Sequence, residues 1–164
     1  MPSKDLASDD ASTADREIVI ERTVNASREL VWRAWTEADQ IAKWWGPNGF
    51  TTTIHAMDVR VGGAWRFIMH GPDGTDYPNK IVYREIVKPE RLVYDHGEDN
   101  DAHSSSFRST VTFVAQGRKT KVTMRALFAS AEARAATLKY GAIEGGEQTL
   151  ARLDQHVATM SPVG

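Results

Sequence analysis

Residues 130–160 read SAEARAATLKYGAIEGGEQTLARLDQHVATM and form the longest stretch of the chain with helical periodicity. Apolar or small residues recur there at steps of three to five, on or near one helix face: Leu138, Ala142, Gly145 or Gly146, Leu150, Leu153, Val157 and Met160. Ser130 stands at the predicted N-cap. Glycines at 141, 145 and 146 each cost about 1 kcal/mol relative to Ala. They predict a kink or a close helix–sheet approach near Gly145.

Residues 50–128 alternate apolar and polar side chains between turn signals, which predicts antiparallel hairpins. A Gly117-Arg118 turn places Val114 opposite Lys121 in the last hairpin. The inner face of that hairpin is then almost wholly apolar: Phe107, Ser109, Val111, Phe113, Val122, Met124, Ala126 and Phe128. A Gly62-Gly63 turn would place Asp58 opposite Phe67 and His55 opposite His70. Both faces of this hairpin carry apolar residues, so its inner face is chosen by size alone, as the one with Trp65, Phe67 and Met69.

The hairpin around residues 88–91 carries polar groups on its predicted inner face. Arg84 falls opposite Asp95, which is typical of a solvent-facing charge pair. The alternation then points four side chains inward: Tyr83, Glu85, Tyr94 and His96. A carboxylate near an imidazole in an apolar cavity can be tuned for proton transfer, or can form a hydrogen-bond network that orients a ligand.

The start of the chain predicts a strand at residues 18–24, with Ile18, Ile20 and Val24 on one side and Arg22 breaking the alternation. A helix follows from residues 25–27, and a T-x-x-D capping box at 36–39 predicts a second short helix over residues 39–44. One strand, two short helices, six strands in hairpins and a long final helix indicate an α+β fold.

Bulk properties exclude several classes of protein. The 164 residues suit one domain at 16–161 behind a disordered tail at 1–15, rich in Ser, Asp and Ala. A net charge of −2 argues against nucleic-acid binding, and the lack of a long apolar run against a membrane span. With no cysteine, disulfides and thiolate chemistry are excluded, and the default is a cytoplasmic protein. Two histidines, His55 and His70, make only half a metal site, so neither metal nor cofactor is expected.

Six motifs together resemble the family of homologues of the activator of heat-shock protein 90 ATPase. They are VWRAWT at 31–36, WWGP at 44–47, DVRVGGAWR at 58–66, YREIV at 83–87, PERL at 89–92 and EGGEQTLARL at 144–153. The resemblance implies the START-like superfamily and its helix-grip fold. In that fold a curved antiparallel sheet of six or seven strands wraps around a long C-terminal helix and leaves a cavity between them. The family usually has a bulky residue where this chain has Gly146, which predicts extra pocket volume there.

Three functions follow as hypotheses. The first is binding of a small apolar or aromatic ligand in this cavity. Its predicted ligand-binding residues are Trp44, Trp45, Phe50, Asp58, Trp65, Phe67, Met69, Tyr83, Glu85, Tyr94, His96, Phe107, Val111, Phe113, Met124, Phe128, Leu138, Ala142, Gly145, Gly146 and Leu150. The second is an enzyme of the cyclase, hydrolase or dehydratase kind, with Glu85 or His96 as general acid or base. The third, implied by the family name, is a domain that regulates a chaperone ATPase. Met57, Val59 and Ile68 on the outer face also leave a homodimer open.

Overall fold

The computed structural model describes residues 14–99, 105–139 and 141–160. Its elements are η1 Ala14–Arg16, β1 Glu17–Val24, α2 Arg28–Thr36, α3 Ala38–Ile41, β2 Thr51–Met57, β3 Ala64–His70, β4 Asp76–Val87, β5 Arg91–Glu98, β6 Ser105–Gln116, β7 Lys119–Phe128, α4 Ala131–Lys139 and α5 Ala142–Val157. Residues 1–13 of the predicted tail lie outside the described residues. The last two residues of that tail, 14 and 15, belong to η1.

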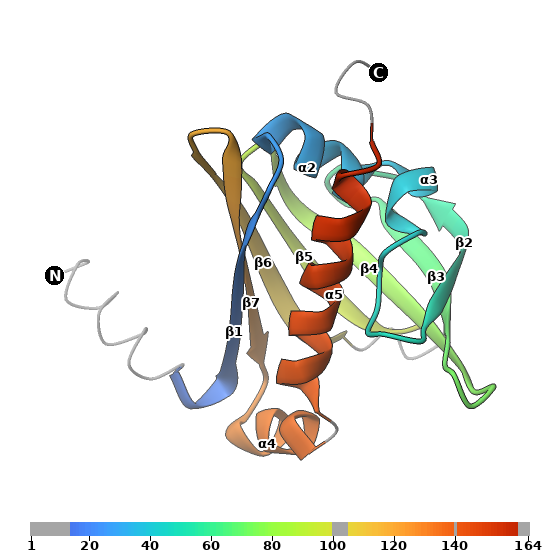
Figure 1. The fold of residues 1–164 in the computed structure, drawn as a ribbon. Helices are drawn as coiled ribbons and strands as arrows, with labels where there is room; N and C mark the ends of the chain where they lie inside the picture. The colour runs from blue at the N-terminus through green and yellow to red at the C-terminus, as the bar shows by residue number, and fades with distance from the viewer. Residues whose placement is uncertain (1–13, 100–104, 140, 161–164) are drawn as a thin grey trace, which may run out of the picture.

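Seven antiparallel strands in the order β1-β7-β6-β5-β4-β3-β2 curve around α5, as Figure 1 shows. The predicted helix-grip fold is therefore confirmed. The inner face of the sheet is apolar because alternate residues of each strand point to the same side. Ile18 and Ile20 of β1 are buried, for example, whereas Val19 between them is 45% exposed.

The β6–β7 hairpin has the predicted register throughout. Val114 lies opposite Lys121 and Thr112 opposite Thr123. Its inner positions Val111, Phe113, Val122 and Phe128 are buried, as the alternation predicts. A short turn between strands of regular alternation determines the register locally.

The predicted register of the β4–β5 hairpin is wrong: Val82, not Arg84, lies opposite Asp95, and β4 carries a bulge. Tyr83 pairs with Tyr94, but the next paired residue of β4 is Glu85, opposite Val93. The extra residue, Arg84, still reaches Asp95, with Nε 2.7 Å from Oδ2. Since a bulge reverses the alternation beyond it, Glu85 turns away from the inner face.

The predicted register of β2 and β3 is wrong. Ile54, not Asp58, lies opposite Phe67, and β2 ends at Met57. Residues 58–63 form a longer turn because their backbone bonds β4, the next strand of the sheet: the amide of Gly62 donates to Tyr83 O at 2.8 Å, and Tyr83 N donates to Gly63 O at 3.0 Å. A neighbouring strand thus supplies partners that a two-residue turn would lack.

The two histidines of this hairpin do not face each other. His70 lies opposite Thr51, whereas His55 is exposed at a register shift of β2. Within the described ranges no cluster of three His, Asp or Glu side chains is placed to hold a metal.

The predicted C-terminal helix is two helices. Ser130 caps α4, its Oγ accepting from Ala133 N at 3.0 Å. Gly141 has φ +76°, a left-handed conformation that separates α4 from α5. The helix therefore breaks at Gly141, and α5 continues as one helix through Gly145, while its residues Leu150, Leu153 and Val157 are buried.

The helices after β1 also differ from the sequence pattern. Ser27 caps α2 by accepting from Leu30 N. The predicted capping box is wrong: Glu37 is the N-cap residue of α3 without a side-chain bond, and the Thr36 hydroxyl donates to Trp32 O. The Thr36 hydroxyl does not cap α3 because it hydrogen-bonds the preceding turn of α2 instead.

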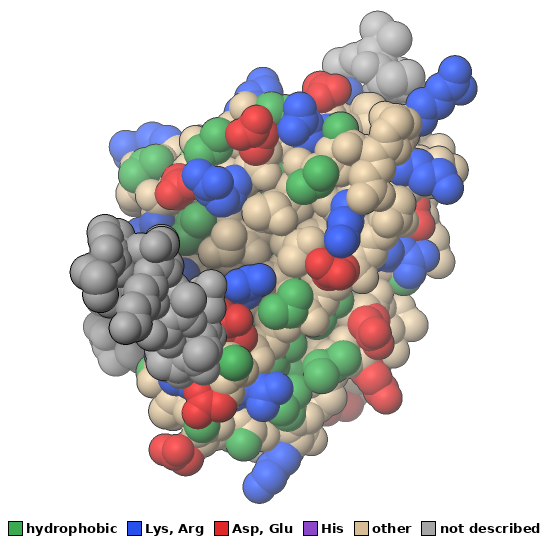
Figure 2. Space-filling model, turned by 90° about the vertical axis from the view of Figure 1, so that its left-hand side faces the viewer, with side chains coloured by type: hydrophobic (Ala, Val, Ile, Leu, Met, Phe, Trp, Pro, Cys, Tyr) green, Lys and Arg blue, Asp and Glu red, His purple; other side chains and the backbone are tan. Residues whose placement is uncertain are grey.

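The surface around β1 mixes charges of both signs (Figure 2). Lys121 Nζ lies 3.6 Å from Glu21, and Arg125 lies 3.7 Å from Glu17, in two ion pairs between β7 and β1. Arg22, which breaks the alternation of β1, pairs with Asp154 of α5 at 3.2 Å. None of the helices in the described residues combines the length and apolar character that a membrane span requires.

Candidate functional site

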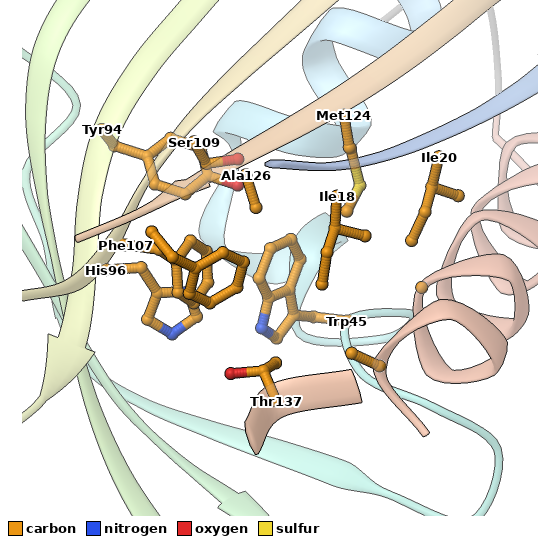
Figure 3. A pocket seen from close by; sticks show the side chains of 13 residues that line it. Ile18, Ile20, Trp45, Tyr94, His96, Phe107, Ser109, Met124, Ala126 and Thr137 are labelled. Atoms are coloured by element: carbon orange, nitrogen blue, oxygen red, sulfur yellow. The ribbon is translucent and has the colours of Figure 1, made fainter. Parts of the chain in front are cut away.

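A cavity of about 150 Å³ lies between the inner face of the sheet and the C-terminal helices. Figure 3 shows side chains converging on it from strands, helices and the loop after α3. It is lined by Ile18, Ile20, Trp45, Tyr94, His96, Phe107, Ser109, Met124, Ala126, Phe128, Thr137, Ala142 and Gly146. Apolar and aromatic walls with a few polar groups are typical of small-molecule sites.

The cavity exists because two small residues, Ser109 and Ala126, occupy the centre of one row of the sheet. Tyr94, Ser109, Ala126 and Ile18 are successive cross-strand partners on β5, β6, β7 and β1. The rows on either side carry larger groups: His96, Phe107 and Phe128 on one side, Val111, Met124 and Ile20 on the other. The hydroxymethyl and methyl groups at the centre cannot fill the depth that these neighbours span.

Two hydroxyl groups meet on the floor of this cavity. Ser109 is only 2% exposed, and its side chain hydrogen-bonds the hydroxyl of Tyr94. Burial raises the pKa of Tyr94 to about 12, so the phenol stays protonated. One of the two hydroxyl protons makes the mutual bond, so the pair offers both donor and acceptor capacity to a bound molecule.

His96 is a neutral imidazole with a defined tautomer. Its Nε2 lies 2.8 Å from Asn79 Oδ1, and Asn79 Nδ2 donates to Tyr77 O at 2.7 Å. That bond makes the Asn79 oxygen the acceptor for the ring, so Nε2 carries the proton and Nδ1 keeps its lone pair. Burial lowers the pKa of His96 from 6.5 to about 4.

Trp45 forms the wall that the loop after α3 contributes. Its indole lies between Phe107 and Ile18 in the view of Figure 3. The backbone on either side is fixed: Arg152 of α5 donates to Gly46 O at 2.8 Å, and Thr52 donates to Trp45 O at 3.1 Å. The aromatic wall is therefore held by both the helix and the sheet.

Residues 25–158 match the family model described as activator of Hsp90 ATPase homolog 1-like protein. The chain belongs to this family. The match runs from α2 to the end of α5 and includes every residue that lines the cavity except Ile18 and Ile20 of β1.

Solved structures agree with this fold. A solution structure from Arthrobacter aurescens has a TM-score of 0.82 at 23% identity, covering 91% of this chain and 90% of that one. A crystal structure from Mycobacterium smegmatis gives 0.79 at 23% identity, covering 91% and 94%. An AHSA1-like protein from Aeromonas hydrophila gives 0.65 at 23% identity, covering 87% and 92%. No protein with a curated description matches the sequence significantly.

Eight of the predicted ligand-binding residues line the cavity: Trp45, Tyr94, His96, Phe107, Met124, Phe128, Ala142 and Gly146. A second group packs in the surrounding core: Trp44, Trp65, Phe67, Tyr83, Val111, Phe113 and Leu150. Phe50 and Met69 lie near Gly46 instead, and Gly145 faces Pro47. Leu138 is half-buried on α4.

Two predicted site residues are on the surface. The Glu85 side chain is 45% exposed and pairs with Arg91, since the bulge at Arg84 turns it outward. Asp58 is 52% exposed and pairs with Arg60 in the turn after β2. The predicted acid–base pair of Glu85 and His96 therefore does not form, and His96 stands in the cavity without a carboxylate among the lining residues.

The volume predicted at Gly146 is occupied by β1. A Cβ at Gly146 would lie 2.0 Å from Ile20 Cδ1, so the predicted close approach of helix and sheet is confirmed there. Five lining residues were missed: Ile18, Ile20, Ser109, Ala126 and Thr137. The alternation of β1 and of the last hairpin already places four of them inward, but Thr137 lies off the apolar stripe of the predicted helix.

Proposed function

We propose that the protein binds one small, uncharged molecule, about the size of a single aromatic ring, between sheet and helix. The cavity is the observation that supports this function. None of the described residues that line it carries a charge at neutral pH, because His96 is held neutral by burial. A charged ligand would lose its hydration there without a counter-ion.

The volume limits the ligand. A cavity of roughly 150 Å³ with apolar walls can hold one benzene-sized molecule. Fused rings and long acyl chains exceed this space unless the walls move. The size therefore favours monocyclic compounds.

The polar groups favour a ring with one hydrogen-bonding substituent. The hydroxyl pair of Tyr94 and Ser109 lies on the floor, and His96 borders the same cavity. A phenol could exchange hydrogen bonds with this pair while its ring contacts Phe107 and Met124. Simple phenols are the ligand class that we propose.

Thermal unfolding with phenol, benzoate and 1-naphthol tests this function. Phenol at ten times its dissociation constant should raise Tm by about 4 °C, because only the folded state binds it. Benzoate should fail because of its charge, and 1-naphthol because of its size. The proposal is wrong if benzoate stabilises the protein as phenol does, or if calorimetric titration detects no binding of phenol.

A cavity-filling variant locates the binding. Ala126→Leu places an isobutyl group in the cavity and should abolish the phenol shift. Ala115→Leu is the matched control, since Ala115 is exposed on the same hairpin. Circular dichroism checks that both variants fold. If Ala126→Leu binds phenol as tightly as the wild type, phenol does not bind in this cavity.

A further inference from the structure

Three side chains form a hydrogen-bonded row on β2, β3 and β4, away from the cavity. Thr53 Oγ1 lies 2.8 Å from His70 Nε2, and His70 Nδ1 lies 2.7 Å from Asp76 Oδ1. None of the three lines the cavity. They come from the three strands at the β2 edge of the sheet, to the right in Figure 1.

The strand register brings these residues together. His70 and Asp76 are paired directly across the β3–β4 hairpin. Thr51 is the partner of His70 on β2, so Thr53, two residues further along, shares the same face. Diagonal neighbours of this kind lie within reach of a long or aromatic side chain. The imidazole of His70 therefore bridges the two outer members of the row.

The hydrogen-bond partners of His70 determine which of its ring nitrogens carries the proton. An ionised Asp76 only accepts, so the neutral imidazole carries its proton on Nδ1 and keeps a lone pair on Nε2. The Thr53 hydroxyl then donates to Nε2. A hydroxyl, an imidazole and a carboxylate in this order are the parts of a nucleophile with its general base and orienting group.

We infer that Thr53 is a nucleophile that takes acyl groups from activated esters. Thr53 Oγ attacks the ester carbonyl while its proton passes to His70 Nε2. The bond from the acyl carbon to the leaving oxygen breaks, and the leaving alcohol takes the proton from His70. The products are O-acylated Thr53 and the free alcohol, and Asp76 is a positioning residue.

The exposure of the row fits small substrates. Thr53 is exposed, and the His70 and Asp76 side chains are 36% and 59% exposed. An ester with a short acyl group and a good leaving group can reach Oγ1 without a pocket.

Acetylation by para-nitrophenyl acetate, followed by peptide mapping, tests this site on the full chain. Acetyl-Thr53 should form in the wild type and with Thr53→Ser, where the serine is acetylated. It should be lost with Thr53→Val. His70→Gln should slow the acetylation of Thr53 about 100-fold, the lower range for general-base catalysis. Asp76→Asn should slow it as well, and Asp76→Glu should restore part of the rate.

Thr51→Val is the matched control, because Thr51 is a neighbouring β2 hydroxyl that lies directly opposite His70. This variant should leave the acetylation rate of Thr53 unchanged. Circular dichroism confirms the fold of each variant. Acetyl groups on lysines alone, or equal rates at Thr51 and Thr53, would overturn the proposal, as would an unchanged rate with His70→Gln.

Discussion

The inner face of the sheet has a filled half and a hollow half. On β3, Trp65 stacks on Phe67 with ring centroids 4.1 Å apart, and the ring of Trp45, from the loop after α3, lies 5.1 Å from that of Trp65. On β6 and β7 the central positions are Ser109 and Ala126, and the cavity lies over them. The backbone is the same antiparallel sheet in both halves. Side-chain volume along one row therefore determines whether a helix-grip sheet encloses a core or a pocket.

One row of cross-strand partners passes from the filled half into the hollow half. It runs from Tyr83 on β4 through Tyr94 and Ser109 to Ala126 on β7. Both tyrosines are 2% exposed and fill their half. Two aromatic rings are thus followed by a hydroxymethyl group and a methyl group. The change in size along the row coincides with the edge of the cavity.

The largest effect should come from the wall between the halves. Trp45→Ala removes an indole that is 6% exposed and contacts aromatic rings on several sides. We expect a loss of about 3–5 kcal/mol in the free energy of unfolding, measured by urea denaturation. Tyr77→Ala, an exposed aromatic control, should cost far less. A loss below about 1 kcal/mol with Trp45→Ala would mean that the wall is not packed.

His96, at the border of both halves, should make stability depend on pH. Its pKa is about 6.5 unfolded and about 4 folded, because burial disfavours the charged ring. Between these values the unfolded chain binds a proton that the folded chain does not. Stability is therefore complete above about pH 6.5 and falls as pH drops toward 4, by about 1.4 kcal/mol per pH unit and roughly 3 kcal/mol in all.

Urea denaturation at several pH values, with His96→Gln as the comparison, measures this term. The variant should show a shallower loss between pH 6.5 and 4. The pKa of His156 is also lowered, by burial and then by Lys43, but His156 is present in both proteins and cancels in the difference. Parallel curves for wild type and variant would show that folding does not lower the pKa of His96.

The same two halves separate what the sequence could predict from what it could not. In the β6–β7 hairpin a tight turn and regular alternation determine the register, and the sequence predicts both. In the filled half, Tyr83 bonds the turn of Gly62 and Gly63, and β4 carries a bulge at Arg84. Both depend on a neighbouring strand. The spacing of residues within one hairpin does not show which strand will pair beside it. The register of β2 and the direction of Glu85 were therefore predicted wrongly.

The candidate site was predictable to a similar degree. Alternation identified Tyr94 and His96 as inward residues, and the large aromatics were expected around a pocket. The hollow itself depends on Ser109 and Ala126, which are notable only once they are seen to be adjacent on paired strands. Sequence spacing on one strand does not reveal that two small residues meet. The triad of Thr53, His70 and Asp76 was missed for the same reason, since the assumed register paired His70 with His55.

The smallest expected effect on stability is that of Gly146→Ala, at the boundary of the hollow half. An alanine Cβ there would lie 2.0 Å from Ile20 Cδ1, but 3.4 Å or more from the other Ile20 atoms. Gly146→Ala gains about 1 kcal/mol of helix propensity. It also forces the Ile20 methyl group toward the cavity, at a cost of about 0.5–1.5 kcal/mol if the side chain leaves its rotamer. The two terms nearly cancel in the wild-type background.

Ile20→Val removes the clashing atom and reveals the propensity term alone. In that background Gly146→Ala should stabilise the protein by about 1 kcal/mol, so the double-mutant cycle should give a coupling of roughly 1 kcal/mol. Gly145→Ala is the control, since its Cβ meets Pro47 at 3.3 Å and not β1, and it should behave alike in both backgrounds. Phenol binding should weaken only where the Ile20 methyl group is displaced. If Gly146→Ala changes the free energy of unfolding equally in the wild-type and Ile20→Val backgrounds, the clash is relieved by a shift of the whole helix. The Ile20 methyl group is then not displaced into the cavity.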